Sequence, residues 1–192
     1  PRVGDTADWS FTGWVYWNGG GDWQRIFDLG LDTSHYLFLT PKAGGSGLRF
    51  AINSGGGEQQ LNAPAPSAGV WTHLAVTISA NTGKLFVNGA AVATNASMTV
   101  HPMDVGTKFN YLGKSQFSAD PLFWGRFDDF RFVSSALNDA QVAAIYSTPP
   151  PQFRTTPINK PDAFVGRAYG ATLAGDAIGN GPAARKATGS MS

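Results

Sequence analysis

Apolar and polar residues alternate along most of the chain, in short runs separated by Gly-, Ser- and Asn-rich segments. Such alternation is typical of β-strands that bury one face. The pattern predicts strands over residues 10–17, 23–30, 36–40, 48–52, 59–61, 71–78, 84–88, 110–113 and 125–134. Strands spaced about 8–12 residues apart, with almost no helical periodicity, predict an all-β fold: an antiparallel sandwich of two sheets.

The last predicted strand, over residues 125–134, carries two adjacent carboxylates, Asp128 and Asp129. Alternation places Phe130 and Phe132 on the buried side and Phe127 on the opposite side. Because neighbouring strand residues point to opposite faces, the two carboxylates are not expected to act on one bond. The aromatic residues Trp14, Trp17 and Trp71 also lie on alternating strands, so we expect them in the core.

Helical periodicity is almost confined to residues 138–147. Asn138 precedes a run in which Val142 and Ile145 recur at helical spacing, which predicts an N-cap and one short C-terminal helix. Three prolines at 149–151 then end the helix. We therefore expect a sandwich domain over residues 1–149 and a Pro-rich linker at the start of 150–192.

The composition excludes several classes of function. The chain contains no Cys, which removes disulfides, thiol catalysis and Cys-based zinc sites. Its net charge is only +1, so nothing favours binding to nucleic acid or to an anionic membrane. No apolar run approaches the ~20 residues of a membrane span. The composition fits an extracellular bacterial module, and a cytosolic protein could have the same composition.

Five motifs follow one another over residues 9–147 in an order that resembles the laminin-G-like jelly roll of the concanavalin A-like lectin/glucanase type. These motifs are Trp71-Thr-His-Leu-Ala-Val-Thr, Lys84-Leu-Phe-Val-Asn-Gly89, Tyr111-Leu-Gly113, Gly125-Arg-Phe-Asp-Asp-Phe-Arg and Ala136-Leu-Asn-Asp-Ala-Gln-Val142. Each motif is weak alone, and their order makes the resemblance specific. It implies a bacterial module of the type appended to secreted glycosidases.

The resemblance implies a function as well as a fold. Such modules bind polysaccharide without cleaving it and hold a covalently linked glycoside hydrolase at its substrate. Residues 14–17 and 23–30 resemble modules fused to arabinan- and xylan-degrading enzymes, which favours a plant or marine polysaccharide of that type. The implied protein is secreted and monomeric. A protein–protein adhesion module is the alternative, because animal laminin-G domains have that function.

Two segments depart from the family pattern. Only about nine residues precede the strand at 11–17, where the family has a further strand, so the first strand is expected to be missing and a sheet edge to be open. Oligomerisation could occur through that edge. Residues 158–176 resemble the opening strand of a bacterial immunoglobulin-like repeat, so 150–192 is expected to be a linker with an incomplete repeat, which could cover the edge.

Protein sites for sugars combine an aromatic platform, which stacks on the apolar face of the ring, with polar side chains that bind the hydroxyls. Such combinations occur here at the turn around residue 23, at Tyr36 and in the loop of residues 114–124. The predicted carbohydrate-binding residues are Trp23, Gln24, Tyr36, Gln116, Phe117, Asp120 and Trp124.

Catalysis is the less favoured alternative. Glycoside hydrolysis needs two carboxyl groups on either side of one bond, and the chain has a single Glu, Glu58, in a Gly-rich loop. A glycoside hydrolase would therefore have to use unconventional carboxylates. His73 lies within a predicted strand and is expected to be a structural, hydrogen-bonded residue rather than a catalytic one.

Calcium is the one cofactor that the resemblance implies. In this superfamily a structural Ca²⁺ often binds the first Asp of the closing strand together with carbonyls of a Gly turn. The matching residue is Asp128, and Asp28, which stands near Gly30, is a further candidate ligand. Oxygen ligands of this kind suit a hard cation. The alternative is that Asp128 binds turn amides and Asp129 pairs with Arg126 or Arg131.

Overall fold

The computed structural model describes residues 5–45 and 47–148. The predicted linker and immunoglobulin-like segment of 150–192 lie outside the described residues. The elements in chain order are β1 Trp9–Trp17, β2 Phe27–Gly30, β3 His35–Ala43, β4 Gly47–Ser54, β5 Gln59–Ala63, β6 Trp71–Ser79, β7 Thr82–Val87, β8 Ala90–Asn95, the short 3₁₀ helix η1 Pro102–Asp104, β9 Phe109–Leu112, β10 Gly125–Val133 and α1 Asp139–Ser147.

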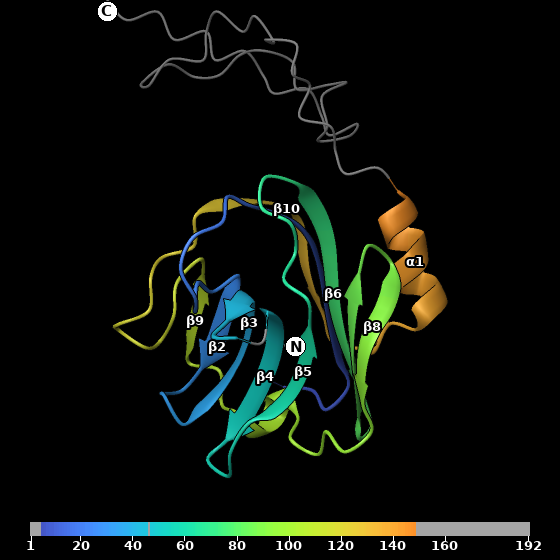
Figure 1. Ribbon diagram of the computed structural model, residues 1–192. Helices are drawn as coiled ribbons and strands as arrows, with labels where there is room; N and C mark the ends of the chain where they lie inside the picture. Colours follow the sequence, from blue (N-terminus) through green and yellow to red (C-terminus); the bar gives the residue numbers. More distant parts are fainter. Residues whose placement is uncertain (1–4, 46, 149–192) are drawn as a thin grey trace, which may run out of the picture. The chain divides into compact units, whose positions relative to one another are not determined.

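The described strands form two five-stranded antiparallel sheets, which confirms the predicted two-sheet sandwich (Figure 1). One sheet, the β1 sheet, has the order β10-β1-β6-β7-β8. The other, the β3 sheet, has the order β5-β4-β3-β2-β9. β10 pairs with β1 and lies at one edge of its sheet. Within the described residues, no helix is long and apolar enough to cross a membrane.

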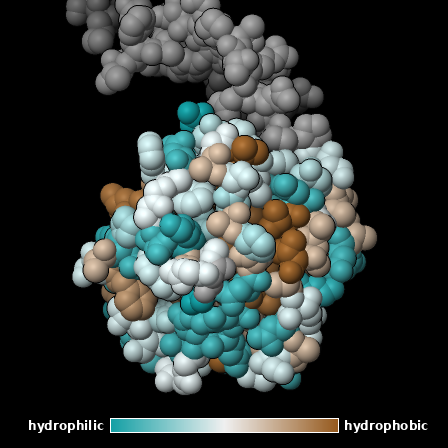
Figure 2. Space-filling model, viewed as in Figure 1, coloured by the Kyte–Doolittle hydropathy of each residue, from teal (hydrophilic) through white to brown (hydrophobic). Residues whose placement is uncertain are grey.

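The core lies between the sheets and is largely aromatic. Trp9 and Phe11 of β1, Phe27 of β2 and Phe50 of β4 are fully buried. The ring centroids of Phe11 and Phe27 are 4.9 Å apart, and those of Trp9 and Phe50 are 6.2 Å apart, so the two layers interdigitate. Burial of such rings is the main contribution to sandwich stability. The face drawn in Figure 2 is mainly hydrophilic, with hydrophobic residues in separate groups.

Two strand predictions and one prediction of burial fail. β8 was not predicted, because its Ala-Ala-Val-Ala-Thr-Asn sequence consists of small, mostly exposed residues that show no alternation. β2 begins at Phe27 rather than at residue 23. Of the three tryptophans expected in the core, Trp17 is buried there, whereas Trp14 and Trp71 are half-buried and lie outside the buried core cluster.

A bulge in β10 breaks the alternation on which its assignment rested. The pairing of β10 with β1 shifts register there, and Asp129 adopts a φ of 48°. As a result Phe127, Phe130 and Phe132 all pack against the core, so the prediction of Phe127 on the opposite side was wrong. The carboxylate of Asp128 accepts a hydrogen bond from the Asp129 N–H at 2.8 Å. The bulge explains why neighbours in this strand do not simply alternate.

The helix α1 begins as its sequence predicts. The side chain of Asn138 accepts a hydrogen bond from the Gln141 N–H, and the Gln141 side chain accepts one from the Asn138 N–H, which is a capping box. Val142 is buried against Ala75 and Phe86 on the outer face of the β1 sheet. In Figure 1 the helix lies beside β8.

His73 of β6 is a buried structural residue, in agreement with the expectation from sequence. Its side chain is fully buried, and its Nε2 lies 2.7 Å from Oγ1 of Thr12. Burial lowers the pKa of His73 to about 4, and the nearby charge of Asp129 only partly opposes this. The imidazole is therefore neutral in the folded protein at pH 7.

We predict that His73 makes the fold sensitive to acid. The unfolded chain binds a proton at His73 near pH 6.5, and the folded chain binds it only near pH 4. The contribution of neutral His73 to the free energy of unfolding is therefore fully present above about pH 6.5 and is lost as the pH falls towards 4. The loss over this window is on the order of 3 kcal/mol. Urea unfolding at pH 7 and at pH 4.5 measures this effect. The free energy of unfolding should fall less between the two pH values in His73→Gln than in the wild type.

His35, at the half-exposed start of β3, provides the matched control. The variant His35→Gln should lose nearly as much stability as the wild type between pH 7 and pH 4.5, because this half-exposed imidazole pairs with the exposed carboxylate of Asp32. An equal loss of stability in His73→Gln and in the wild type would contradict the assignment.

Candidate functional site

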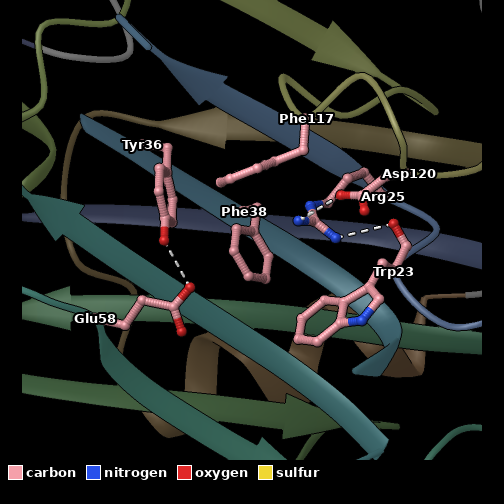
Figure 3. A pocket seen from close by; sticks show the side chains of 7 residues that line it. All are labelled: Trp23, Arg25, Tyr36, Phe38, Glu58, Phe117 and Asp120. Atoms are coloured by element: carbon pink, nitrogen blue, oxygen red, sulfur yellow. Dashed lines mark hydrogen bonds and ion pairs between the residues drawn. The ribbon is translucent and has the colours of Figure 1, made fainter. Parts of the chain in front are cut away.

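A pocket of about 270 Å³ lies on the outer face of the β3 sheet (Figure 3). Four segments supply its walls: the turn before β2, the strand β3, the residue before β5, and the loop of residues 113–124 between β9 and β10. The lining residues are Trp23, Arg25, Tyr36, Phe38, Glu58, Phe117 and Asp120. The pocket therefore combines aromatic walls with charged side chains.

Strand β3 supplies the floor through its alternation. Leu37 and Leu39 belong to the core, so Tyr36 and Phe38 point to the outer face. The rings of Tyr36 and Phe38 are stacked, with their centroids 5.5 Å apart. Phe117 from the 113–124 loop meets the Tyr36 ring edge-on, also at 5.5 Å. Three aromatic rings thus form a continuous apolar wall.

Trp23 reaches the pocket through an unusual backbone conformation. Its φ is 68°, a region that non-glycine residues adopt rarely and at an energetic cost. Two hydrogen bonds hold this conformation: the Trp23 N–H donates to the Lys42 carbonyl at 2.7 Å, and the Trp23 carbonyl accepts from Nη1 of Arg25 at 2.9 Å. Because the indole is only half-buried, it is available to a ligand.

Arg25 is a buried cation at the centre of the site. The residue is 2% exposed, and its guanidinium carbon lies 3.9 Å from the centroid of the Phe38 ring. Its Nη2 lies 3.0 Å from Oδ2 of Asp120, and its Nε lies 3.4 Å from Oδ2 of Asp28. Burial lowers the pKa of Arg25, whereas the two carboxylates raise it. Arginine still remains charged at any ordinary pH.

Asp28 of β2 fixes the 113–124 loop. Its Oδ1 accepts a hydrogen bond from Nε2 of Gln116 at 2.8 Å, and its Oδ2 accepts one from the Gln116 N–H at 3.1 Å. Ser115 shares its hydroxyl between Asp28 and Asp120. Burial raises the pKa of Asp28, and the hydrogen bonds from Gln116 oppose this shift. Asp28 therefore joins β2 to the loop that carries Phe117 and Asp120.

Glu58 forms a second polar group at the other side of the pocket. Its Oε1 accepts a hydrogen bond from the Tyr36 hydroxyl at 2.8 Å, and its Oε2 accepts one from Nε2 of Gln60 at 2.6 Å. Nη1 of Arg49 lies 3.6 Å from the same Oε2. Burial raises the pKa of Tyr36 to about 12. The phenol is therefore a permanent hydrogen-bond donor at neutral pH.

The structure brings together four of the seven predicted binding residues. Trp23, Tyr36, Phe117 and Asp120 all line the pocket. Gln116 contacts Asp28 behind it.

The other two predicted residues lie outside the pocket lining. Gln24 is 3% exposed, with its Oε1 accepting from the indole of Trp17 and from the Trp124 N–H. Its Nε2 donates to the Gly19 carbonyl at 3.0 Å, so Gln24 holds the turn together. Trp124 is 62% exposed.

Three lining residues were not predicted as binding residues: Arg25, Phe38 and Glu58. Phe38 stands two residues after Tyr36, and a strand period of two places both on one face, so this signal was present in the sequence. Arg25 could not be placed from the sequence, because residues 23–26 form a turn and not the predicted strand, so strand alternation does not apply to them. In the sequence, Glu58 is a candidate for catalysis only, because it is the single Glu of the chain.

The two predicted calcium ligands lie on different sheets, Asp28 on β2 and Asp128 on β10. Both oxygens of Asp28 accept hydrogen bonds from protein donors. Across residues 5–45 and 47–148, no three His, Cys, Asp or Glu side chains are grouped so that they could hold a metal ion. In this structure Asp28 binds the 113–124 loop, and calcium at Asp28 and at Asp128 stays a prediction.

Solved structures with the same fold include domains from glycosidases. Domain 4 of AbnA, an extracellular GH43 arabinanase from Geobacillus stearothermophilus solved with arabinotriose, is 21% identical, with a TM-score of 0.59 over 74% of this chain and 68% of that one. The CBM40 of Ruminococcus gnavus IT-sialidase, bound to α2,3 sialyllactose, is 18% identical, with a TM-score of 0.64 over 75% and 85%. The leech intramolecular trans-sialidase is 19% identical, with a TM-score of 0.65 over 76% of this chain and 24% of that one. Similarity at these identities establishes the fold.

Sequence comparison identifies the family. No curated protein sequence matches the chain significantly. A family model described as concanavalin A-like lectin/glucanases superfamily, of laminin G type, matches residues 1–143. These residues include every strand described above and all the residues that line the pocket. The chain therefore belongs to the laminin G-like family of the concanavalin A-like lectin/glucanase superfamily.

Proposed function

We propose that the protein is a non-catalytic carbohydrate-binding module that binds polysaccharide in the pocket on the β3 sheet. The observation that carries this proposal is the combination of exposed aromatic surface at Trp23 and Phe117 with the hydrogen-bonding groups of Glu58 and Asp120. A sugar ring has one apolar face and a rim of hydroxyls, so it is complementary to such a wall. A volume of about 270 Å³ suits one or two sugar rings rather than a long chain segment.

The solved relatives support this proposal. One was determined with arabinotriose and another with sialyllactose. We propose an arabinan- or xylan-type polysaccharide as the ligand. We further propose that the module is secreted and is covalently linked to a glycoside hydrolase, as domain 4 is within an extracellular arabinanase.

The geometry of the carboxylates supports binding rather than catalysis. The side chain of Glu58 accepts hydrogen bonds from Tyr36 and Gln60 and lies near Arg49. Asp120 is paired with the guanidinium of Arg25. A glycosidase needs two carboxyl groups that flank the bond it cleaves. In this pocket both carboxylates have partners within the protein, an arrangement that suits hydrogen bonding to a ligand.

We predict that Trp23→Ala and Phe117→Ala each weaken binding to arabinan or arabinoxylan by about tenfold or more, because each removes an aromatic surface against the sugar. Affinity gel electrophoresis on both polysaccharides, with circular dichroism to verify folding, measures this effect. Trp124→Ala is the matched control, since Trp124 is exposed but lies outside the pocket lining, and its affinity should be unchanged.

The opposite pattern, in which only Trp124→Ala reduces binding, would move the site to the start of β10. Release of reducing sugar from arabinan, xylan or β-glucan by the wild-type protein would show that the module is catalytic.

Calcium binding has a separate test. Asp128 already accepts the Asp129 N–H, so an ion there would take its remaining ligands from backbone carbonyls and water. If the ion binds, addition of CaCl₂ after treatment with EDTA should raise the melting temperature of the wild type and of Asp129→Ala, but not that of Asp128→Ala. An identical response of all three proteins would remove Asp128 as a ligand.

A further inference from the structure

We infer that the pocket selects neutral sugars and discriminates against sugars that carry a carboxylate, such as uronic or sialic acids. This inference rests on the proposed function and concerns the same site. It is carried by the charges that line and support the pocket, and it names Glu58 and Asp120 as the residues that determine specificity.

The cation at the centre of the pocket is already paired with two protein carboxylates. A carboxylate ligand is recognised best by two parallel N–H groups of one guanidinium. In Arg25 the Nη1 group donates to the Trp23 carbonyl, Nη2 pairs with Asp120, and Nε faces Asp28. The Arg25 side chain is only 3% exposed. An incoming anion would have to displace a protein carboxylate from a buried ion pair, which is unfavourable.

The second guanidinium, that of Arg49, also has protein partners. Its Nε donates to Oδ1 of Asn62 at 2.8 Å, and its Nη1 faces Glu58. Its guanidinium carbon lies 5.7 Å from the centroid of the Trp23 ring, at the side of the pocket. Arg49 therefore neutralises a protein carboxylate.

The balance of these charges is negative. The three carboxylates of Asp28, Asp120 and Glu58 face two guanidiniums, which leaves a net formal charge of −1. Two of the three carboxylates are accessible, because the side chain of Glu58 is 22% exposed and that of Asp120 is 16% exposed, whereas that of Arg25 is 3% exposed. A ligand carboxylate would approach these oxygens at short range in a partly desolvated site, where repulsion between like charges is strong.

A neutral sugar benefits from the same arrangement. Ionised carboxylates are acceptors only, and each oxygen has lone pairs beyond those used by the protein donors. Sugar hydroxyls can donate to Glu58 and Asp120, whose hydrogen bonds are stronger because the acceptor is charged. Figure 3 shows Glu58 beyond the Tyr36 hydroxyl and Asp120 beside Arg25, with the aromatic rings between them. A sugar ring in contact with the accessible aromatics, Trp23 and Phe117, could present hydroxyls to both sides.

The inference is tested with a pair of ligands that differ at the carboxyl group and with two further oligosaccharides, one neutral and one acidic. Isothermal titration calorimetry would compare oligosaccharides from glucuronoxylan with the same preparation after reduction of its carboxyl groups, together with neutral arabino-oligosaccharides and sialyllactose. We expect the wild type to bind the carboxyl-reduced form at least about tenfold more tightly than the acidic form at low salt. This ratio should fall in 0.5 M NaCl, because salt screens the repulsion.

The variant Glu58→Gln should bind the acidic ligand more tightly than the wild type does, and it should bind the neutral ligand equally well or less tightly. The ratio of the affinity for the carboxyl-reduced form to that for the acidic form should therefore fall. Asp139→Asn is the matched control, because it removes one negative charge at the start of α1, where Asp139 is 60% exposed and pairs with Lys84. It should leave the ratio unchanged.

Two outcomes would overturn the inference, and they are distinguishable. Equal or tighter binding of the acidic form by the wild type would contradict the charge argument and leave carbohydrate binding in place. Absence of binding to every glycan, neutral and acidic, would overturn the proposed function and this inference with it.

Discussion

The buried guanidinium of Arg25 is the interaction on which the candidate site depends. A cation withdrawn from water costs several kcal/mol unless it is paired and hydrogen-bonded. Here Asp28 from β2 and Asp120 from the 113–124 loop supply the countercharges, and Phe38 supplies an aromatic face. Removal of Arg25 would leave both carboxylates without their cation, and removal of Asp120 would take away the carboxylate nearest to the guanidinium. The position of the loop on the β3 sheet is therefore a consequence of charge pairing as much as of packing.

The same charge pairing explains how a sandwich can present an ordered pocket on its outer face. Strand β3 provides a rigid floor through Tyr36 and Phe38, because its other face is locked into the core. The turn at Trp23 is bound to the sheet through the Lys42 carbonyl of β3, and the 113–124 loop is bound to it through Asp28 of β2. Arg25 joins them, since it pairs with Asp120 on one side and donates to the Trp23 carbonyl on the other. The unusual φ of Trp23 persists because these contacts hold it.

The sequence predicted the arrangement of the strands more accurately than the residues of the pocket. The sequence pattern located nine of the strands, and all of these except β9 pack one face against the core. Asn138 marked the start of α1. Alternation failed wherever the backbone departs from a regular strand: at the bulge of Asp129, and at the turn that conceals Arg25. Trp23, Tyr36 and Phe117 could be found as aromatics near turns. Their convergence with Glu58 could not, because it depends on pairing between distant strands, which single-residue patterns do not encode.

The choice of sugar follows from the outer face and its loops rather than from the fold. Structures with this fold were solved with a neutral arabinotriose and with an acidic sialyllactose, so the sandwich itself does not decide the charge of the ligand. In this chain the residue that holds the loop in place, Asp120, also contributes negative charge to the pocket. An exchange of Asp120 for a neutral residue would admit an anion only by leaving Arg25 without its closest carboxylate. Asp120 therefore affects both the stability of the loop and the charge that the pocket accepts. Glu58 is more exposed, so its replacement should change the charge of the pocket with less effect on the fold.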